Sequence, residues 1–134
     1  MKTVEEIIRQ KPVFLHHWID KESVLRDFDG KRGDNDSEVE VDRDVNILFA
    51  SYGYELYSGN AFVLFEKDGV LFEVCGSHCS CYGLEGQWEP EEVVLKELEN
   101  RLVKGFLGED SYSGNNFKRE LCEFLDVEFK LNDN

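Results

Sequence analysis

The clearest pattern of apolar and polar positions is a pair of apolar runs, residues 62–67 and 70–75, joined by Asp68-Gly69. An Asp-Gly pair between two apolar runs is typical of a two-residue β-hairpin turn. In that register Lys67 pairs with Val70, Phe65 with Phe72, Val63 with Val74, and Phe62 with Cys75. Both faces of the hairpin then carry large apolar side chains, which predicts that the hairpin lies at the centre of a sheet.

Apolar segments before the hairpin predict further parts of the core. Residues 46–51 form a short apolar run that is typical of a buried strand. Nearer the N-terminus, we expect four side chains to pack into the core: Phe14, Leu15, Trp18 and Ile19.

Two helices are predicted ahead of these strands. Thr3 and Glu6 have the spacing of a capping box, which begins a short helix. Pro12 disfavours helix in the residue before it, so this helix should end near Lys11. Asp20 is placed to cap a second helix over residues 21–28.

Two more helices are predicted after the hairpin. The first is expected over residues 90–103, because a proline suits the first turn and Glu91 and Glu92 complement the helix dipole. Trp88 should then pack against Val93. The last helix buries one apolar face with a cysteine beside it: Phe117, Leu121, Cys122, Phe124 and Leu125.

Helices at both ends of the chain and strands between them predict an α+β fold. A chain of 134 residues that is 41% hydrophobic is sufficient for one core. We therefore expect residues 1–134 to form a single domain, with an antiparallel sheet around the central hairpin packed by the N-terminal and C-terminal helices. Residues 29–44 are rich in charged and turn-forming residues and are expected to be an exposed acidic loop or edge segment.

Charge narrows the class of partner. The net charge is −14, from 29 acidic and 15 basic residues. Such a charge repels a phosphate backbone, so we expect no direct binding of nucleic acid and favour a basic protein as the partner. The candidate partner-binding residues come from two acidic segments: Glu38, Glu40, Asp42 and Asp44, and then Glu85, Glu89, Glu91 and Glu92.

The first of these segments has a spacing of its own. If residues 37–44 are extended, Glu38, Glu40, Asp42 and Asp44 lie about 6.8 Å apart along one side. That spacing is on the scale of a phosphate backbone, which is the pattern of a nucleic-acid mimic. A solvated strand edge, kept from aggregating by its charge, explains the same pattern without a partner.

The ends and apolar segments of the chain predict its location. Residues 1–6 carry acid where a signal peptide needs an apolar run, and no segment approaches the roughly 20 apolar residues of a membrane span. We therefore expect a cytoplasmic protein with no membrane partner. In a reducing compartment its cysteines are thiols or metal ligands rather than disulfides.

Three cysteines and one histidine fall within seven residues: Cys75, His78, Cys79 and Cys81. These are zinc-ligand types, although structural zinc sites usually draw pairs of ligands from two separate places. A reactive thiol would need a base, which His78 supplies in sequence and which His16 or His17 can supply through the fold. Packing of small side chains in a Gly-rich loop is the third interpretation.

The segments 47–52 and 62–66, followed by 76–91 with its Gly-Ser-His-Cys-Ser-Cys-Tyr-Gly run, resemble a family of small acidic proteins of phages and prophages. The likeness covers most of the chain from Val45 onward. No activity comes with that resemblance, so it assigns no functional residue. It implies a setting, the host cytoplasm, in which small acidic phage proteins bind and inhibit host machinery that handles nucleic acid or defends the cell.

Together these features predict a non-catalytic interaction protein of phage type, with no catalytic residues and no cofactor, which binds and inhibits a basic host protein through its acidic surface. The alternative is a zinc-binding or reactive-thiol protein that uses the segment from His78 to Cys81.

Overall fold

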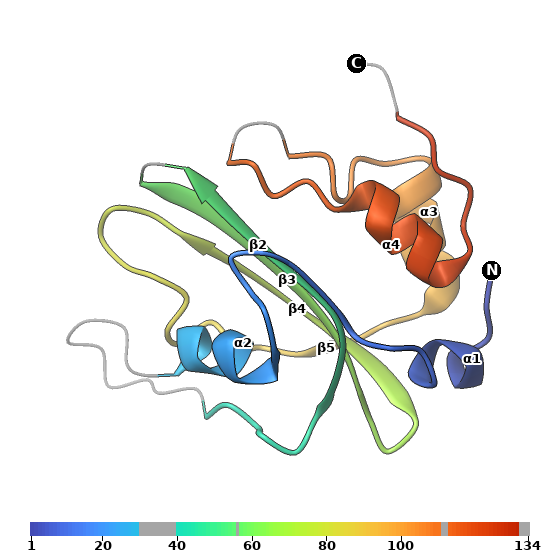
Figure 1. Cartoon of the computed structure of the whole chain (residues 1–134), viewed down its shortest axis with the longest axis horizontal. Coiled ribbons are helices and arrows are strands. Elements are labelled where there is room, and N and C mark those ends of the chain that lie inside the picture. The colour runs from blue at the N-terminus through green and yellow to red at the C-terminus, as the bar shows by residue number, and fades with distance from the viewer. Residues whose placement is uncertain (30–39, 56, 111–112, 132–134) are drawn as a thin grey trace.

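Five strands lie side by side in the order β1-β2-β3-β4-β5 (Figure 1). The structure, a computed structural model, describes residues 1–29, 40–55, 57–110 and 113–131. In chain order the elements are α1 (Val4–Ile8), β1 (Val13–His16), α2 (Lys21–Phe28), β2 (Asn46–Glu55), β3 (Ser58–Lys67), β4 (Val70–His78), β5 (Glu91–Glu92), α3 (Leu95–Val103) and α4 (Lys118–Leu125). The described residues form one α+β domain, which confirms the predicted class.

The hairpin has the predicted register, from Lys67 opposite Val70 to Phe62 opposite Cys75. Asp68 and Gly69 have φ angles of 53° and 83°. A two-residue turn that matches strand twist needs positive φ at both central residues, which this pair tolerates. The pairing continues beyond the predicted ends and brings Gly59 opposite His78.

The sheet is mixed rather than wholly antiparallel, which corrects the prediction. β1 runs parallel to β2, with Val13 opposite Phe49 and His16 opposite Tyr52. Sequence patterns did not reveal β1 because a four-residue edge strand is too short to show alternation. Of the side chains expected in the core there, Trp18 is buried, but Ile19 is 78% exposed and that prediction was wrong.

Helices cover both faces of the sheet, with α2 on one side and α3 and α4 on the other (Figure 1). The face toward α2 packs these buried side chains together: Trp18, Val24, Leu25, Phe28, Ala50, Tyr52, Val63, Phe65, Val74, Leu84 and Trp88. The opposite face packs side chains from α1, α3 and α4 on the strands: Ile7, Phe49, Phe62, Leu64, Leu71, Leu98, Leu102, Leu121, Cys122 and Phe124. Residues with alternating orientation along β2 to β4 therefore serve two separate cores.

The helix predicted from residue 90 begins later, at Leu95. Glu91 and Glu92 instead form β5, and the amide of Val93 donates to the carbonyl oxygen of Leu71 at 2.8 Å. Trp88 does not pack against Val93: its ring stacks on Phe65 on the α2 face, with centroids 5.4 Å apart, whereas Val93 packs on the other face. Pairing with the edge of β4 has replaced the predicted first helical turn.

The local helix signals at the N-terminus are confirmed. Thr3 and Asp20 each form a capping box, at the starts of α1 and α2. At the other end, α4 buries the predicted face, and Cys122 is fully buried in the core. No helix in the described ranges has both the length and the apolar character needed to cross a membrane.

Much of the predicted acidic segment, including Glu38, lies outside the described residues. Where the structure resumes, the chain bends at Arg43 and Asp44 rather than forming a strand. The Asp42 carboxylate accepts a hydrogen bond from the Asp44 amide at 2.9 Å, which closes a tight local turn. The described part therefore does not have the even spacing of an extended row, so that prediction is corrected from residue 40 onward.

Candidate functional site

Charged side chains, most of them acidic, gather where β2 begins and β3 turns into β4. This region, called the hairpin end, comprises Asp42, Asp44, Glu66, Lys67 and Asp68. The register places Asn46 opposite Glu66, so the segment before β2 lies beside the hairpin turn. Asp44, Glu66, Lys67 and Asp68 line a polar depression of about 320 Å³ there. The strand register therefore brings Asp44, from the first predicted acidic segment, beside Glu66 and Asp68 of the hairpin.

The only basic residue between Arg43 and Lys96 in the sequence is Lys67, and Asp42 binds it. The hydrogen bond from the Lys67 ammonium, helped by the Asp44 amide, lowers the pKa of Asp42. The same bond raises the pKa of Lys67. Because Asp42 is engaged with Lys67, the negative charge at the hairpin end comes mainly from Asp44, Glu66 and Asp68.

β5 adds carboxylates at the same end of the sheet. Glu91 and Glu92 are exposed and pair with Glu73 and Phe72, close to the start of β4. Glu73 itself accepts a 2.5 Å hydrogen bond from Arg101 on α3, which neutralises its charge within the molecule. The outer carboxylates on β5 are thus the ones presented to solvent.

The predicted acidic residues therefore do not all gather at one place. Asp42 and Asp44 lie at the hairpin end, and Glu91 and Glu92 lie on the neighbouring strand edge. Three others lie elsewhere along the chain: Glu40, which is exposed, Glu89, which is exposed just before β5, and Glu85, which is half-buried and accepts from the Gly83 amide at 3.0 Å.

The structure separates the four candidate metal ligands. Cys75 lines a pocket on the α3–α4 face of β4, beside Phe62. His78 lies toward the α2 face, where its Nδ1 is 2.8 Å from the Tyr52 hydroxyl. Cys79 and Cys81 follow in a turn that the Cys79 amide closes by donating to the Tyr82 carbonyl. Among the described residues, no three His, Cys, Asp or Glu side chains are grouped closely enough to hold a metal ion.

The thiols differ in acidity. The Cys81 amide donates to the Cys79 sulfur at 3.4 Å, and this bond lowers the pKa of Cys79. Burial, followed by the neighbouring Glu73 carboxylate, raises the pKa of Cys75 to about 11, even though part of that residue faces solvent. Cys75 lines a pocket, so the residue is partly open to solvent while protein atoms surround its sulfur and raise its pKa. Cys79 is therefore the thiol that ionises most readily of the two.

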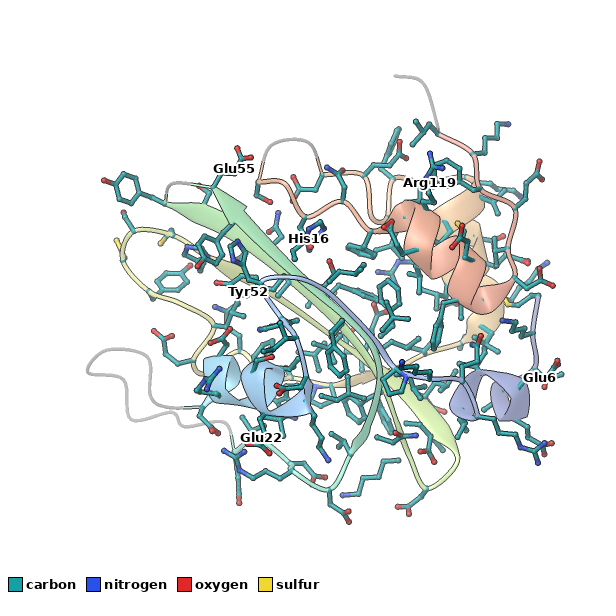
Figure 2. All side chains as sticks on the ribbon, viewed as in Figure 1. Glu6, His16, Glu22, Tyr52, Glu55 and Arg119 are labelled. Carbon is teal, nitrogen blue, oxygen red and sulfur yellow. The ribbon has the colours of Figure 1, made fainter. Side chains whose placement is uncertain are left out.

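A cluster of aromatic and histidine rings that was not predicted from the sequence lies at the opposite end of the sheet. This region, called the aromatic end, comprises His17, Tyr52, Tyr54 and His78 (Tyr52 is labelled in Figure 2). The imidazole of His17 stacks on the Tyr54 ring, with centroids 3.8 Å apart and planes 15° apart. His78 meets the Tyr54 ring edge-on at 5.0 Å and the Tyr52 ring at 5.8 Å.

Gly59 makes this arrangement possible. It lies in register between Tyr54 on β2 and His78 on β4. A Cβ atom on Gly59 would lie 2.4 Å from the Tyr54 Cβ and 2.6 Å from the His78 Nδ1. The missing side chain lets two rings from non-adjacent strands meet across β3. Continuing the predicted hairpin register by three residues would have placed His78 opposite Gly59, so the sequence contained part of this signal.

His16, the last residue of β1, and His17, the residue after it, have side chains in different places. His17 joins the aromatic end, whereas the His16 Nε2 lies 2.8 Å from the carbonyl oxygen of Asn116, in the segment before α4. His17 therefore lies near His78 of the Cys/His segment, because both imidazoles contact the Tyr54 ring.

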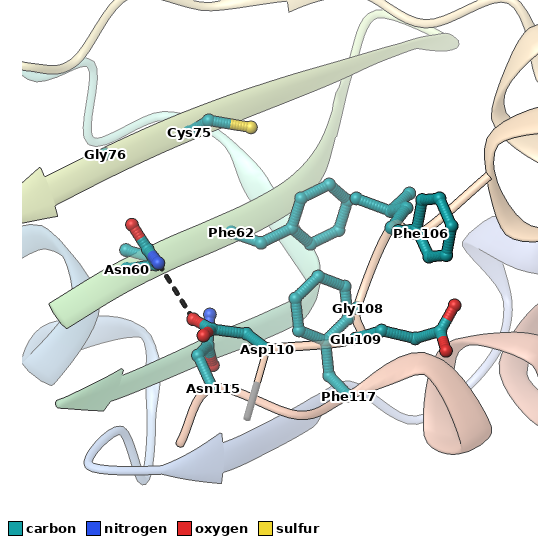
Figure 3. A pocket seen from close by; sticks show the side chains of 12 residues that line it. Asn60, Phe62, Cys75, Gly76, Phe106, Gly108, Glu109, Asp110, Asn115 and Phe117 are labelled. Carbon is teal, nitrogen blue, oxygen red and sulfur yellow. Dashed lines mark hydrogen bonds between the residues drawn. The ribbon is translucent and has the colours of Figure 1, made fainter. Parts of the chain in front are cut away.

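A pocket of about 430 Å³ lies between the sheet and the segment that joins α3 to α4 (Figure 3). Its apolar side consists of Phe62 and Phe117, whose rings stack with centroids 4.9 Å apart. The sulfur of Cys75 lies over one side, and a hydrogen bond from Asn60 to Asp110 of 2.8 Å borders the other. This volume is within the range of small-ligand sites, but its polar rim is already hydrogen-bonded internally.

Comparison of the chain with protein-family models, with curated proteins and with solved structures found no match in any of the three.

Proposed function

We propose that this protein is a non-catalytic interaction protein that binds a basic protein through the carboxylates of the hairpin end and of β5. Its specific form is inhibition of a host complex that handles nucleic acid or defends the cell, the setting that the phage resemblance implies. The observation that carries the proposal is the gathering of Asp44, Glu66, Asp68, Glu91 and Glu92 at one end of a sheet whose strands contain a single lysine and no arginine.

Electrostatics explain why this end would contact a partner. Like charges at the surface of a protein with a net charge of −14 raise the rate of encounter with a basic protein and repel acidic ones. The depression beside Asp44 and Asp68 is polar, which suits lysine and arginine side chains better than apolar ones. The proposal does not depend on an evenly spaced carboxylate row, because the chain bends at Arg43 and Asp44.

The first test is capture of a partner from a host lysate by affinity-tagged protein. A variant with Asp44→Asn, Asp68→Asn, Glu91→Gln and Glu92→Gln removes four charges from the proposed surface. A matched variant with Glu5→Gln, Glu22→Gln, Glu97→Gln and Glu123→Gln removes four charges from exposed positions on α1, α2, α3 and α4.

The first variant should lose the captured protein, and the matched variant should retain it. Binding of the wild type should weaken as salt shortens the Debye length from about 10 Å at 0.1 M to about 3 Å at 1 M. A partner that binds both variants equally, and stays bound unchanged through high salt, would disprove the electrostatic proposal.

A second candidate function is a reactive-thiol protein, which the lowered pKa of Cys79 favours. A thiolate is the nucleophilic form of cysteine, and the turn that ends at Tyr82 holds this sulfur near the surface. Under this proposal Cys79→Ser abolishes activity with the fold intact, whereas Cys122→Ser at the buried position alters stability alone. Zinc binding remains a prediction, to be tested by native mass spectrometry of protein purified without chelator.

A further inference from the structure

We infer that the aromatic end is a binding site for an arginine side chain of the basic partner. This inference rests on the proposed function and names the residue type that the partner inserts. Four rings at the end of the sheet, His17, Tyr52, Tyr54 and His78, form one contacting group. Their identity and geometry, rather than the charge of the surface as a whole, select the ligand.

The rings are accessible from solvent. Tyr54 is 40% exposed, and His17 is exposed as well. Tyr57, in the connection between β2 and β3 at the same end, is 72% exposed. Exposed tyrosines on strand ends offer large contact areas with little side-chain entropy to lose, and tyrosine and arginine are both enriched among the residues that dominate binding energy.

The geometry suits a flat ligand. His17 already stacks on Tyr54 at 3.8 Å with nearly parallel planes, so the site accommodates planar groups lying on one another. A guanidinium is planar, weakly hydrated and stacks on aromatic rings. An ammonium is compact and strongly hydrated, so a lysine side chain would have to lose more bound water to make the same contact.

Charge at this end favours a cation over a nucleobase, which also stacks on aromatic rings. The described segments that build the aromatic end, residues 16–19, 52–55, 57–59 and 76–85, contain no lysine or arginine. The carboxylates of Asp27 and Glu85 are close enough to add to the effect of burial in raising the pKa of Tyr52. A negatively charged nucleotide would meet repulsion here, whereas an arginine would be attracted.

The aromatic end is separate from the hairpin end. The two lie at opposite ends of β3, a strand of ten residues, which is roughly 30 Å long at about 3.3 Å per residue. A peptide of six residues spans at most about 20 Å. The backbone of such a peptide cannot extend from one end to the other, so its position on the protein distinguishes this inference from the general electrostatic one.

The test is an NMR titration of the protein with hexaarginine amide and, separately, with hexalysine amide, at pH 7.5 and low salt. The imidazole C–H signals of the three histidines report on two places. His17 and His78 belong to the aromatic end, and His16, whose ring contacts Asn116 instead, is the internal control. The backbone amides of Asp68 and Gly69 report on the hairpin end.

We expect hexaarginine to shift the His17 and His78 signals, to leave His16 in place, and to bind more tightly than hexalysine. Tyr54→Leu should weaken hexaarginine about 2- to 30-fold, and Tyr54→Phe, which keeps the ring, should not. Shifts confined to Asp68 and Gly69 would overturn this inference and leave the proposed function standing. Equal affinity for the two peptides with no effect of Tyr54→Leu would overturn it as well, and an absence of shifts at both ends would count against both proposals.

Discussion

The hydroxyl of Tyr52 and the Nδ1 atom of His78 form a 2.8 Å hydrogen bond between two strands that are not neighbours. β3 separates β2 from β4, and the small side chain of Ala61 lies in register beside Tyr52. Burial raises the pKa of the Tyr52 phenol well above its ordinary value, so the phenol keeps its proton and its hydroxyl takes part in this bond. The bond therefore links β2 to β4 across β3 at the aromatic end.

Replacing Tyr52 with phenylalanine removes that bond and keeps the ring. We expect Tyr52→Phe to lower the free energy of unfolding by about 1 kcal/mol, the usual net contribution of a hydrogen bond, as measured by urea denaturation at pH 7.5. Tyr54→Phe changes a ring that is 40% exposed and should alter stability by less than about 0.5 kcal/mol. Equal stability of the two variants would show that the Tyr52 bond contributes nothing net.

Gly59 is expected to tolerate no side chain. Gly59→Ala places a Cβ atom 2.4 Å from the Tyr54 Cβ, so the rings of Tyr54 and His78 must move apart. Overpacking of this kind costs about 1–3 kcal/mol. Thermal denaturation would show the loss and the His78 imidazole signal in NMR would shift, whereas the adjacent Ser58→Ala should do neither. A Gly59→Ala protein with wild-type stability and an unmoved His78 signal would contradict the geometry of the aromatic end.

Three of the four thiols, those of Cys79, Cys75 and Cys122, should react with iodoacetamide in a fixed order. Because the thiolate is the reactive form, Cys79, with its lowered pKa, should be alkylated faster than Cys75 at pH 7–8. The rate at Cys75 should keep rising as the pH approaches about 11, its pKa in the folded protein. Cys122 is fully buried and should react only after unfolding. Peptide mass spectrometry of timed samples measures all three, and faster modification of Cys75 than of Cys79 at neutral pH would contradict this order.

Lys118 and Glu109 form a buried ion pair that can be tested by a double-mutant cycle. The Lys118 side chain is 2% exposed, and its ammonium donates to the Glu109 carboxylate at 2.9 Å. Glu109→Gln leaves that charge buried without its carboxylate and should cost about 3–5 kcal/mol at pH 7. Adding Lys118→Met to Glu109→Gln removes the stranded charge and should restore part of the loss in urea denaturation. Strict additivity of the two changes would show that the groups do not interact.

Local sequence chemistry determined several parts of this protein. The Asp68-Gly69 turn set the hairpin register because positive φ at both residues leaves few alternatives. The capping boxes at Thr3 and Asp20 set the starts of α1 and α2, because each satisfies backbone groups within four residues of the chain. The charge that underlies the proposed partner is likewise a property of composition alone.

Pairing between strands that are distant in the sequence determined the elements that local sequence signals do not predict. β1 and β5 are four and two residues long, and each exists because a neighbouring strand supplies its hydrogen bonds. The acidic pair at Glu91 and Glu92 suits a helix start equally well, and the open edge of β4 determined the outcome. Short edge strands have too few residues for a periodic pattern, so only the tertiary structure reveals them.

The candidate sites divide in the same way. The sequence identified the Cys/His segment and the acidic residues, but it could not show that Cys75 and His78 serve opposite faces of β4 or that carboxylates from two segments meet at the hairpin end. The aromatic end joins side chains from β2, β4 and the residue after β1, more than 60 positions apart in the extreme case of His17 and His78. Those rings meet because Gly59 leaves space between them, and that space exists only when three strands are paired in register.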